Sequence, residues 1–297
     1  MAEVPYRREP GDYMFVPQLN QSVSVPVRYA HGPDSVRRPG VPTGELIEYA
    51  WNESQVFPET ERRFWVYVPA QYLREEPASL LVVQDGWYYL DPDSEIRFAV
   101  VLDNLIHKGE MPVTIAVFVD PGEISAEEDP TARRNRNLEY DTYSDAYSRL
   151  LLEEILPPIL RDYRIADDPN RWAVVGGSSG GDCSFTVAWM RPDKFGKVLI
   201  FESSWPQVRG ADYERLIMET PPKPIRVFMQ ASTRDIGWWR GDNNWFSSNL
   251  RIAAALAERG YDLRLVVGDG PHDPNHAGVI LPDGLRWLWR PGTEPAT

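Results

Sequence analysis

The stretch Arg171-Trp-Ala-Val-Val-Gly-Gly-Ser-Ser-Gly-Gly-Asp-Cys-Ser-Phe185 decides the fold class of this chain of 297 residues. An apolar run that is typical of a buried strand leads into glycines that flank two serines, and a helical pattern follows at once. The glycines leave room for a sharp turn in which a serine adopts a strained backbone conformation. This strand, turn and helix is the context that a G-x-S-x-G motif requires, so the sequence predicts a nucleophilic serine at a strand end.

The motif fits the sequence in two phases, with Ser178 or Ser179 at its centre. We favour Ser178, because the strand is expected to end at Val175 and this phase leaves the amide of Ser179 to stabilise a negatively charged oxygen. The alternative to a nucleophile is a glycine-rich turn that only packs closely or binds phosphate.

A serine hydroxyl needs an imidazole base, and the chain has four histidines. We interpret His31, in a proline-rich segment, and His107, at an expected helix end, as structural. The other two follow the last expected strand, at the edge where parallel sheets place their sites. His272 is closer to that strand and is our predicted base, with His276 lining the pocket or capping a helix. A metal-binding pair of these two is disfavoured, because Pro274 between them interrupts a helix.

The acid that orients the imidazole is expected between the serine and the histidine in the chain. Asp235 follows the strand expected at 225–230 after a short loop, and it is our predicted acid. Glu202, at the end of the preceding strand, is the main competitor, and Asp242 and Asp269 are weaker ones.

The loop after the strand expected at 79–84 is the expected source of a second oxyanion donor, the amide of Trp87 or of Gly86. Aromatic residues near the same sheet edge also predict a pocket for a flat aromatic or sugar ring. The candidate pocket residues are Asp85, Tyr88, Trp205, Trp238, Trp239 and His276.

Strands and helices alternate outward from the serine motif. Apolar runs predict strands at 44–51, 62–68, 79–84, 113–119, 171–175, 197–201, 225–230 and 262–267. Helical patterns are expected at 95–107, 141–163, 180–190, 249–259 and near Leu285, the second of them kinked or ended at Pro157-Pro158. We therefore predict an α/β fold with a mostly parallel sheet, helices on both faces and a hairpin at one edge.

The organisation expected from this pattern is one catalytic domain at 43–297, preceded by an extended arm at 1–42. Seven of the 27 prolines fall in the arm, where they remove amide donors and block helices. The arm has enough aromatic surface to lie on the main body or on a second subunit, which would make a homodimer.

Composition excludes several kinds of partner. A formal net charge of −13 would repel nucleic acids and anionic lipid surfaces. The single cysteine, Cys183, allows neither an internal disulfide nor a thiol-rich zinc site. No apolar run is long enough to span a bilayer, and the first residues lack the pattern of a signal peptide, so we expect a cytoplasmic protein without metal or cofactor.

Several distant motifs, in the right order, resemble the enterochelin esterase-like or esterase D-like branch of the α/β hydrolases, a branch related to feruloyl and acetylxylan esterases. The matching segments are 41–45, 67–72, 84–86, 102–106, 139–141, 153–157, 177–181, 281–283 and 285–289. The resemblance implies an α/β-hydrolase fold and a serine ester hydrolase with nucleophile Ser178, acid Asp235 and base His272. The chain departs from the family at Pro271, where a glycine usually precedes the histidine. An acyltransferase with the same residues, or a silent carbohydrate-binding protein, are the alternatives.

Overall fold

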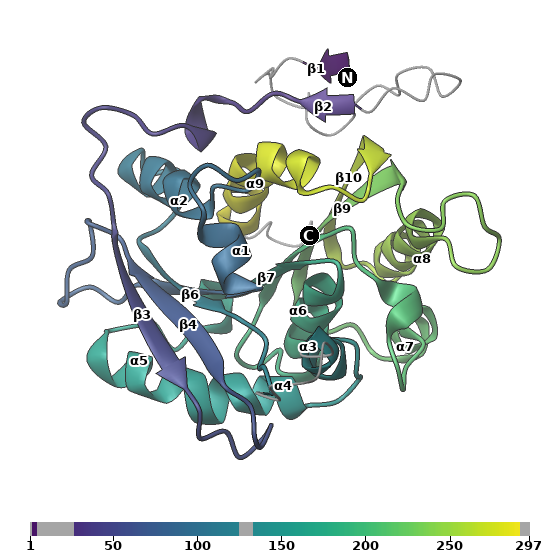
Figure 1. The fold of residues 1–297 in the computed structure, drawn as a ribbon, viewed down its shortest axis with the longest axis horizontal. Coiled ribbons are helices and arrows are strands. Elements are labelled where there is room, and N and C mark those ends of the chain that lie inside the picture. Colours follow the sequence, from purple (N-terminus) through teal and green to yellow (C-terminus); the bar gives the residue numbers. More distant parts are fainter. Residues whose placement is uncertain (1, 5–26, 125–132, 292–297) are drawn as a thin grey trace, which may run out of the picture.

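The computed structural model describes residues 2–4, 27–124 and 133–291, and its centre is a sheet in the order β10-β9-β8-β7-β5-β6-β4-β3 (Figure 1). The six strands from β10 to β6 in this order pair in parallel, whereas β4 is antiparallel to β6 and to β3. The strands are β3 Glu45–Trp51, β4 Arg62–Val68, β5 Ser79–Gln84, β6 Thr114–Val119, β7 Trp172–Gly177, β8 Lys197–Phe201, β9 Arg226–Arg234 and β10 Asp262–Pro271.

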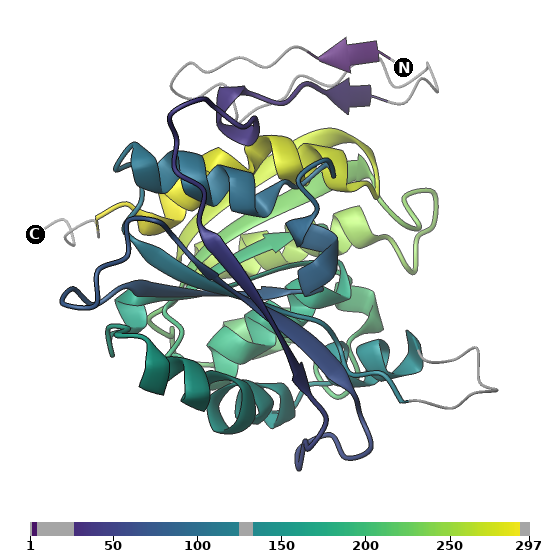
Figure 2. The same cartoon turned by 60° about the vertical axis from the view of Figure 1, so that its left-hand side comes forward.

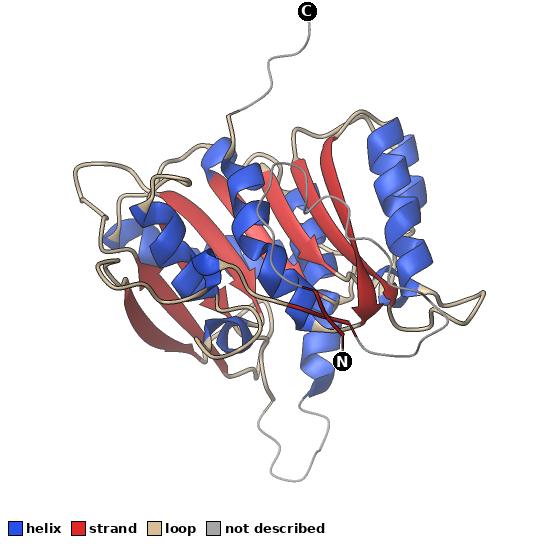
Figure 3. Cartoon of the chain, turned by 90° about the horizontal axis from the view of Figure 1, so that it is seen from above, coloured by secondary structure: helices blue, strands red, loops and turns tan. Residues whose placement is uncertain are grey.

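Helices cover both faces of this sheet (Figure 3). They are α1 Gly86–Leu90, α2 Phe98–His107, α3 Arg133–Tyr140, α4 Ala146–Arg149, α5 Leu156–Asp162, α6 Ser179–Met190, α7 Tyr213–Glu219, α8 Trp245–Glu258 and α9 Pro274–Trp289. Successive side chains of a strand point to opposite faces, so β5 contributes to two cores. Leu80 and Val82 belong to the core under α6 and α8, and Leu81 and Val83 to the core under α2 and α9. Burial on both faces explains the continuous apolar runs of the sequence.

The predicted fold class, the order of the strands along the chain and the edge hairpin are confirmed. The helical region at 141–163 differs from its prediction, because α4 begins only at Ala146 and a π-helical turn at Leu150–Ile155 joins it to α5. Pro157 and Pro158 lie in the first turn of α5 and do not end the helix, since first-turn residues need no amide donor. The short helices α1, α3 and α7 were not predicted.

The described part of the N-terminal arm lies on the main body, along α9 (Figure 2). Strand β2 (Val27–Tyr29) pairs in parallel with β1 (Ala2–Val4), and a 3-10 turn at Pro33–Ser35 follows. Asp34 in this turn forms ion pairs with Lys108, directly after α2, and with Arg286 of α9. Residues 5–26, which the predicted contact with a second subunit also involves, lie outside the described residues. Across the described ranges, no helix is both long and apolar enough to cross a membrane.

Candidate active site

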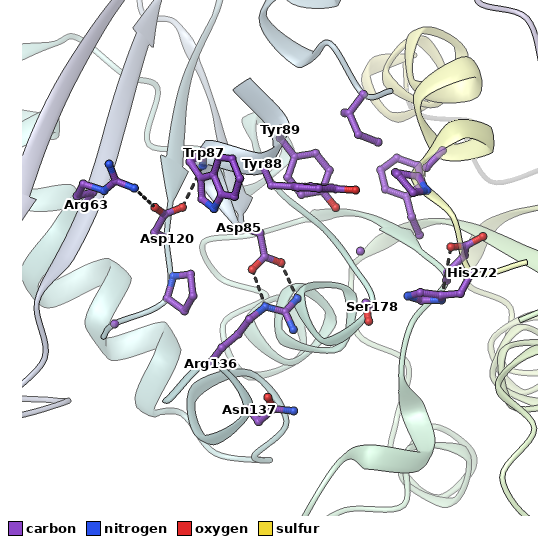
Figure 4. A pocket seen from close by; sticks show the side chains of 18 of the residues that line it. Arg63, Asp85, Trp87, Tyr88, Tyr89, Asp120, Arg136, Asn137, Ser178 and His272 are labelled. Atoms are coloured by element: carbon purple, nitrogen blue, oxygen red, sulfur yellow. Dashed lines mark hydrogen bonds and ion pairs between the residues drawn. The ribbon is translucent and has the colours of Figure 1, made fainter. Parts of the chain in front are cut away.

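Three residues that directly follow parallel strands have a left-handed backbone. Asp85 after β5, Ser178 after β7 and Glu202 after β8 have φ values of 55°, 57° and 45°. A positive φ is costly for residues other than glycine, and it persists only where the surroundings impose it. All three residues line one cavity of about 780 Å³ at the carboxyl ends of the strands, together with His272 (Figure 4). Backbone strain is therefore concentrated where open α/β sheets bind their ligands.

The turn at Ser178 has the tight geometry that its sequence predicts. The amide of Ser178 donates to the carbonyl of Phe201 at 2.8 Å, and α6 begins at the next residue. A Cβ atom on Gly176 would lie 2.2 Å from the carbonyl oxygen of Gly180, so strand and helix approach too closely for any side chain there.

The structure separates the two phases of the serine motif. Ser178 lines the cavity, whereas Ser179 is buried in the first turn of α6, with its hydroxyl 3.4 Å from that of Ser204. First-turn amides of a helix lack partners within the helix, so the Ser179 amide remains a candidate oxyanion donor. The geometry thus places only the Ser178 hydroxyl in the cavity.

His272 and Asp235, which are 37 residues apart in the chain, form a hydrogen bond. Nδ1 of His272 lies 2.7 Å from Oδ1 of Asp235, and the same oxygen accepts from the amide of Ile236. Asp235 is fully buried, and the ring of Trp245 packs edge-on against the imidazole. These contacts leave Nε2 of His272 as the nitrogen that can exchange a proton with Ser178, toward which the ring is directed (Figure 4).

Glu202, the competing acid of the sequence analysis, lies on the same imidazole. Its Oε2 is 3.5 Å from Nδ1 of His272 and accepts from the amide of Asp273 at 3.0 Å. Its Oε1 accepts from the hydroxyl of Ser232 and from the side chain of Gln230. Two carboxylates therefore surround Nδ1, and Asp235 is the nearer one.

Burial and the two carboxylates set the pKa values of this group. Burial alone would lower the pKa of His272, but the hydrogen bond that it donates to Asp235 and the charge of Glu202 outweigh this effect and raise the pKa overall. Burial also raises the pKa of Glu202 to about 7, against the opposing effect of His272. The pKa of Glu202 therefore lies near neutral pH, and the pKa of His272 lies above its ordinary value.

The amide of Trp87, one of the predicted oxyanion donors, is already occupied. It donates to Oδ1 of Asp120 at 3.0 Å, at the end of β6. Burial raises the pKa of Asp120 to about 6, so this carboxylate is charged above that pH and retains the amide. The prediction for Trp87 is therefore wrong in this structure, and Gly86, the other donor that the sequence offered, is the remaining candidate in that loop.

Asp85 and Arg136 form an ion pair in the lining of the cavity. Nε and Nη2 of Arg136 donate to the two carboxylate oxygens of Asp85 at 2.6 and 2.7 Å, and the guanidinium lies over the ring of Tyr140. Despite burial, which lowers it, the pKa of Arg136 is raised by Asp85. A Cβ atom on Gly180 would lie 2.9 Å from Asp85, so Arg136 neutralises a carboxylate beside the serine turn. The sequence analysis did not predict Arg136 or Asp120 as site residues, although Asp120 directly follows a buried strand.

The predicted pocket residues divide into two groups. Asp85 and Tyr88 line the cavity, as do Trp87 and Tyr89, and Trp87 is 59% exposed. The residues that do not line it are Trp205, Trp238, Trp239 and His276. The structure thus places these four residues outside the lining of this cavity, because packing between elements that are distant in the chain decides their orientation.

Each of these four residues has a different environment. Trp205 is buried against Phe185, and Trp238 and Trp239 are exposed on the loop after Asp235. His276 is buried under Tyr29, and burial lowers its pKa to about 3. In the part of the chain that the structure describes, no cluster of three or more ligand side chains could hold a metal ion.

Comparison with known proteins identifies the family. The model of a family described as "Putative esterase" matches residues 54–280. The chain belongs to this esterase family. The match confirms the resemblance that the sequence motifs indicate.

The individual relatives of this chain share less than 30% of its sequence. An iron(III) enterobactin esterase from Dickeya dadantii (strain 3937) is 27% identical over 258 residues, which cover 80% of this chain and 53% of the relative. A crystal structure of the enterobactin esterase from Shigella flexneri in the presence of enterobactin has a TM-score of 0.68 at 22% identity and covers 87% of this chain and 61% of the other. A ferulic acid esterase from the anaerobic fungus Anaeromyces mucronatus has a TM-score of 0.65 at 18% identity, with 85% and 93% covered. The two solved structures share the fold, and the chain spans about half the length of the curated relative.

Proposed function

We propose that this protein is a serine carboxylic ester hydrolase that acts through an acyl-enzyme. One observation carries the proposal: the 2.7 Å bond between His272 and Asp235 lies at the same cavity as the strained Ser178. A serine in a glycine-flanked turn, an imidazole and a buried carboxylate are the groups that acyl transfer needs. Membership of the esterase family supports the same reaction.

In the proposed mechanism, Ser178 Oγ attacks the ester carbonyl carbon and gives its proton to Nε2 of His272. The negative charge that develops on the carbonyl oxygen is stabilised by the amides of Ser179 and Gly86, at the first turns of α6 and α1. Asp235 stabilises the imidazolium through Nδ1. The imidazolium then gives the proton to the leaving alkoxide, so the alcohol departs and an acyl ester remains on Ser178.

Deacylation uses the same groups in the reverse order. His272 takes a proton from water, the oxygen of this water bonds to the acyl carbon, and the bond to Ser178 breaks. The proton returns to Ser178 Oγ, and the carboxylic acid is released. No step needs a cofactor.

We further propose a small-molecule ester with an aromatic or sugar ring as substrate. Trp87 and Tyr88 line the cavity, and 59% and 42% of their respective surfaces are exposed. Exposed aromatic rings in a cavity stack on flat ligands. The relatives, an enterobactin esterase and a ferulic acid esterase, agree with an aromatic group in the substrate. Hydrolysis of feruloyl esters well above that of acetyl esters supports this substrate class, and equal, slow rates on both contradict it.

Fluorophosphonate labelling followed by peptide mapping tests the mechanism, because only an activated serine reacts. We expect one label on Ser178, no label on Ser178→Ala or His272→Ala, and retained labelling of Ser179→Ala, whose main-chain amide is unchanged. Turnover of Ser178→Ala should fall by about 10⁶-fold. Labelling of Ser179 in the wild-type protein, or normal turnover of Ser178→Ala, would refute the assignment.

A further inference from the structure

The segment that carries His272 connects β10 to α9 and is short. Its two ends are Asp269, near the carboxyl end of strand β10, and Asn275, in the first turn of helix α9. The position of the imidazole depends on both ends, because only two residues lie between His272 and each of them. One end is tied to the sheet, since the hydroxyl of Thr233 on β9 donates to Oδ1 of Asp269 at 2.8 Å.

Tyr29 of the N-terminal arm contacts both ends of this segment. Its hydroxyl accepts from the amide of Asp269 at 2.7 Å and donates to the carbonyl of the same residue at 3.2 Å. Its main-chain amide donates to Oδ1 of Asn275 at 2.7 Å, and its carbonyl accepts from Nδ2 at 3.1 Å. One arm residue therefore makes four hydrogen bonds that bracket His272 on either side.

The ring of Tyr29 completes this bracket. It packs on the buried imidazole of His276, with ring centroids 4.5 Å apart. That imidazole covers Gly268, where an added Cβ would lie 2.1 Å from Nδ1 of His276. Tyr29 itself is only 5% exposed, and burial raises its pKa to about 12, so the hydroxyl keeps the proton it donates at any working pH.

The bracket is anchored to a second element of the body. Nδ2 of Asn275 also donates to Oε2 of Glu95, just before α2, at 2.8 Å. Glu95 in turn binds Arg28 and His31, the residues that flank Tyr29 in the arm. Hydrogen bonds from three directions therefore fix Asn275, and the arm forms part of that arrangement.

We infer that Tyr29 is a positioning residue, which holds the segment from Asp269 to Asn275 so that His272 keeps its alignment with Asp235 and Ser178. The inference rests on the proposed function. Tyr29 lies outside residues 54–280, the part that the family model matches, so this device belongs to the arm of this chain. A residue of the N-terminal arm at 1–42 thereby supports the geometry of the active site.

Tyr29→Phe tests the inference, because it removes only the hydroxyl bonds to Asp269 and keeps the ring against His276. Asn275→Ala removes the bonds at the other end and serves as the second variant if the first does not fold. The matched control is Tyr67→Phe. Tyr67 lies on β4, away from the cavity; it is also buried, and its hydroxyl donates to Asp103 at 2.6 Å.

Three measurements follow for each variant: kcat and KM on an aryl ester, the melting temperature, and hydrogen–deuterium exchange of residues 269–275. We expect kcat to fall by roughly ten- to a hundredfold in Tyr29→Phe and Asn275→Ala, with KM within about twofold, as for a small displacement of a catalytic group. Exchange in 269–275 should accelerate, and Tyr67→Phe should change neither kcat nor this exchange.

The outcomes separate this inference from the proposed function. If Tyr29→Phe retains the kcat of Tyr67→Phe and its exchange in 269–275 is unchanged, Tyr29 is structural and the inference is wrong. If the wild-type protein neither hydrolyses esters nor reacts with fluorophosphonate, the proposed function fails. In that case, the hydrogen–deuterium exchange of residues 269–275 in Tyr29→Phe, compared with the wild-type protein, still tests whether Tyr29 holds the segment.

Discussion

The two carboxylates on His272 should contribute unequally, and their removal gives a quantitative test of the proposed acid. The nearest oxygens of Asp235 and Glu202 lie 2.7 and 3.5 Å from Nδ1. Coulombic attraction falls as 1/r, so a full charge on Glu202 acts on the imidazolium with 2.7/3.5, about 0.8, of the strength of Asp235. With a pKa of about 7, Glu202 is about half ionised at pH 7, which reduces this fraction to about 0.4.

This ratio predicts the losses for two isosteric variants. Replacing the triad carboxylate by an amide costs about 10⁴-fold in kcat in serine proteases, and we expect that loss for Asp235→Asn. The loss in Asp235→Asn also includes the wrong imidazole tautomer, which an amide bonded to Nδ1 favours and which Glu202→Gln does not impose. A fraction of 0.4 of the same free energy, about a 40-fold loss at pH 7, is therefore the upper limit that we expect for Glu202→Gln. Because Glu202 gains its charge as the pH rises through 7, the loss in Glu202→Gln should grow between pH 6 and pH 8.

The assay is kcat on a nitrophenyl ester, measured for both variants at several pH values between 6 and 8. Asp242→Asn is the matched control, because Asp242 lies on the loop after Asp235 but is exposed and pairs with Arg240. A larger loss in Glu202→Gln than in Asp235→Asn would make Glu202 the acid and refute the reasoning. A loss in Glu202→Gln that does not change with pH would refute the assigned ionisation.

Three further predictions concern pH and stability. Because the pKa of His272 is raised above its ordinary 6.5, the rate constant kcat/KM should fall as the pH drops through a value above 6.5, where the base becomes protonated; a profile flat down to pH 4 would contradict a histidine base. Gly176→Ala should lower the free energy of unfolding by at least about 3 kcal/mol, because its Cβ would clash with the backbone of Gly180. The control Gly241→Ala has open space around the added Cβ, so its free energy of unfolding should change by no more than about 0.5 kcal/mol. Equal unfolding midpoints for the two variants would count against the tight turn. Arg62→Met should cost about 3–5 kcal/mol in denaturant unfolding, because the fully buried carboxylate of Glu139 loses the two hydrogen bonds that Arg62 donates at 2.8 and 2.9 Å. The double variant with Glu139→Gln should recover part of this loss, and no recovery would show that the pair does not act as a unit.

The local elements could be predicted from the sequence because each depends on neighbouring residues. A run such as residues 80–83, Leu-Leu-Val-Val, is apolar at every position only if both faces of its strand are buried. The glycines around Ser178 similarly specify a turn that no other residue type permits. The strands, their order along the chain, the edge hairpin and the position of the serine turn follow from such local rules.

The contacts that complete the candidate site depend on residues far apart in the chain, so only the tertiary structure decided them. Trp87 and Asp120 meet because β5 and β6 are neighbours, and this pairing removes an amide that the sequence offered as an oxyanion donor. His276 is buried and does not reach the cavity, because Tyr29 packs on it from 247 residues earlier in the chain. Sequence spacing carries no information about which of several loop residues points inward, since packing between distant elements selects that orientation.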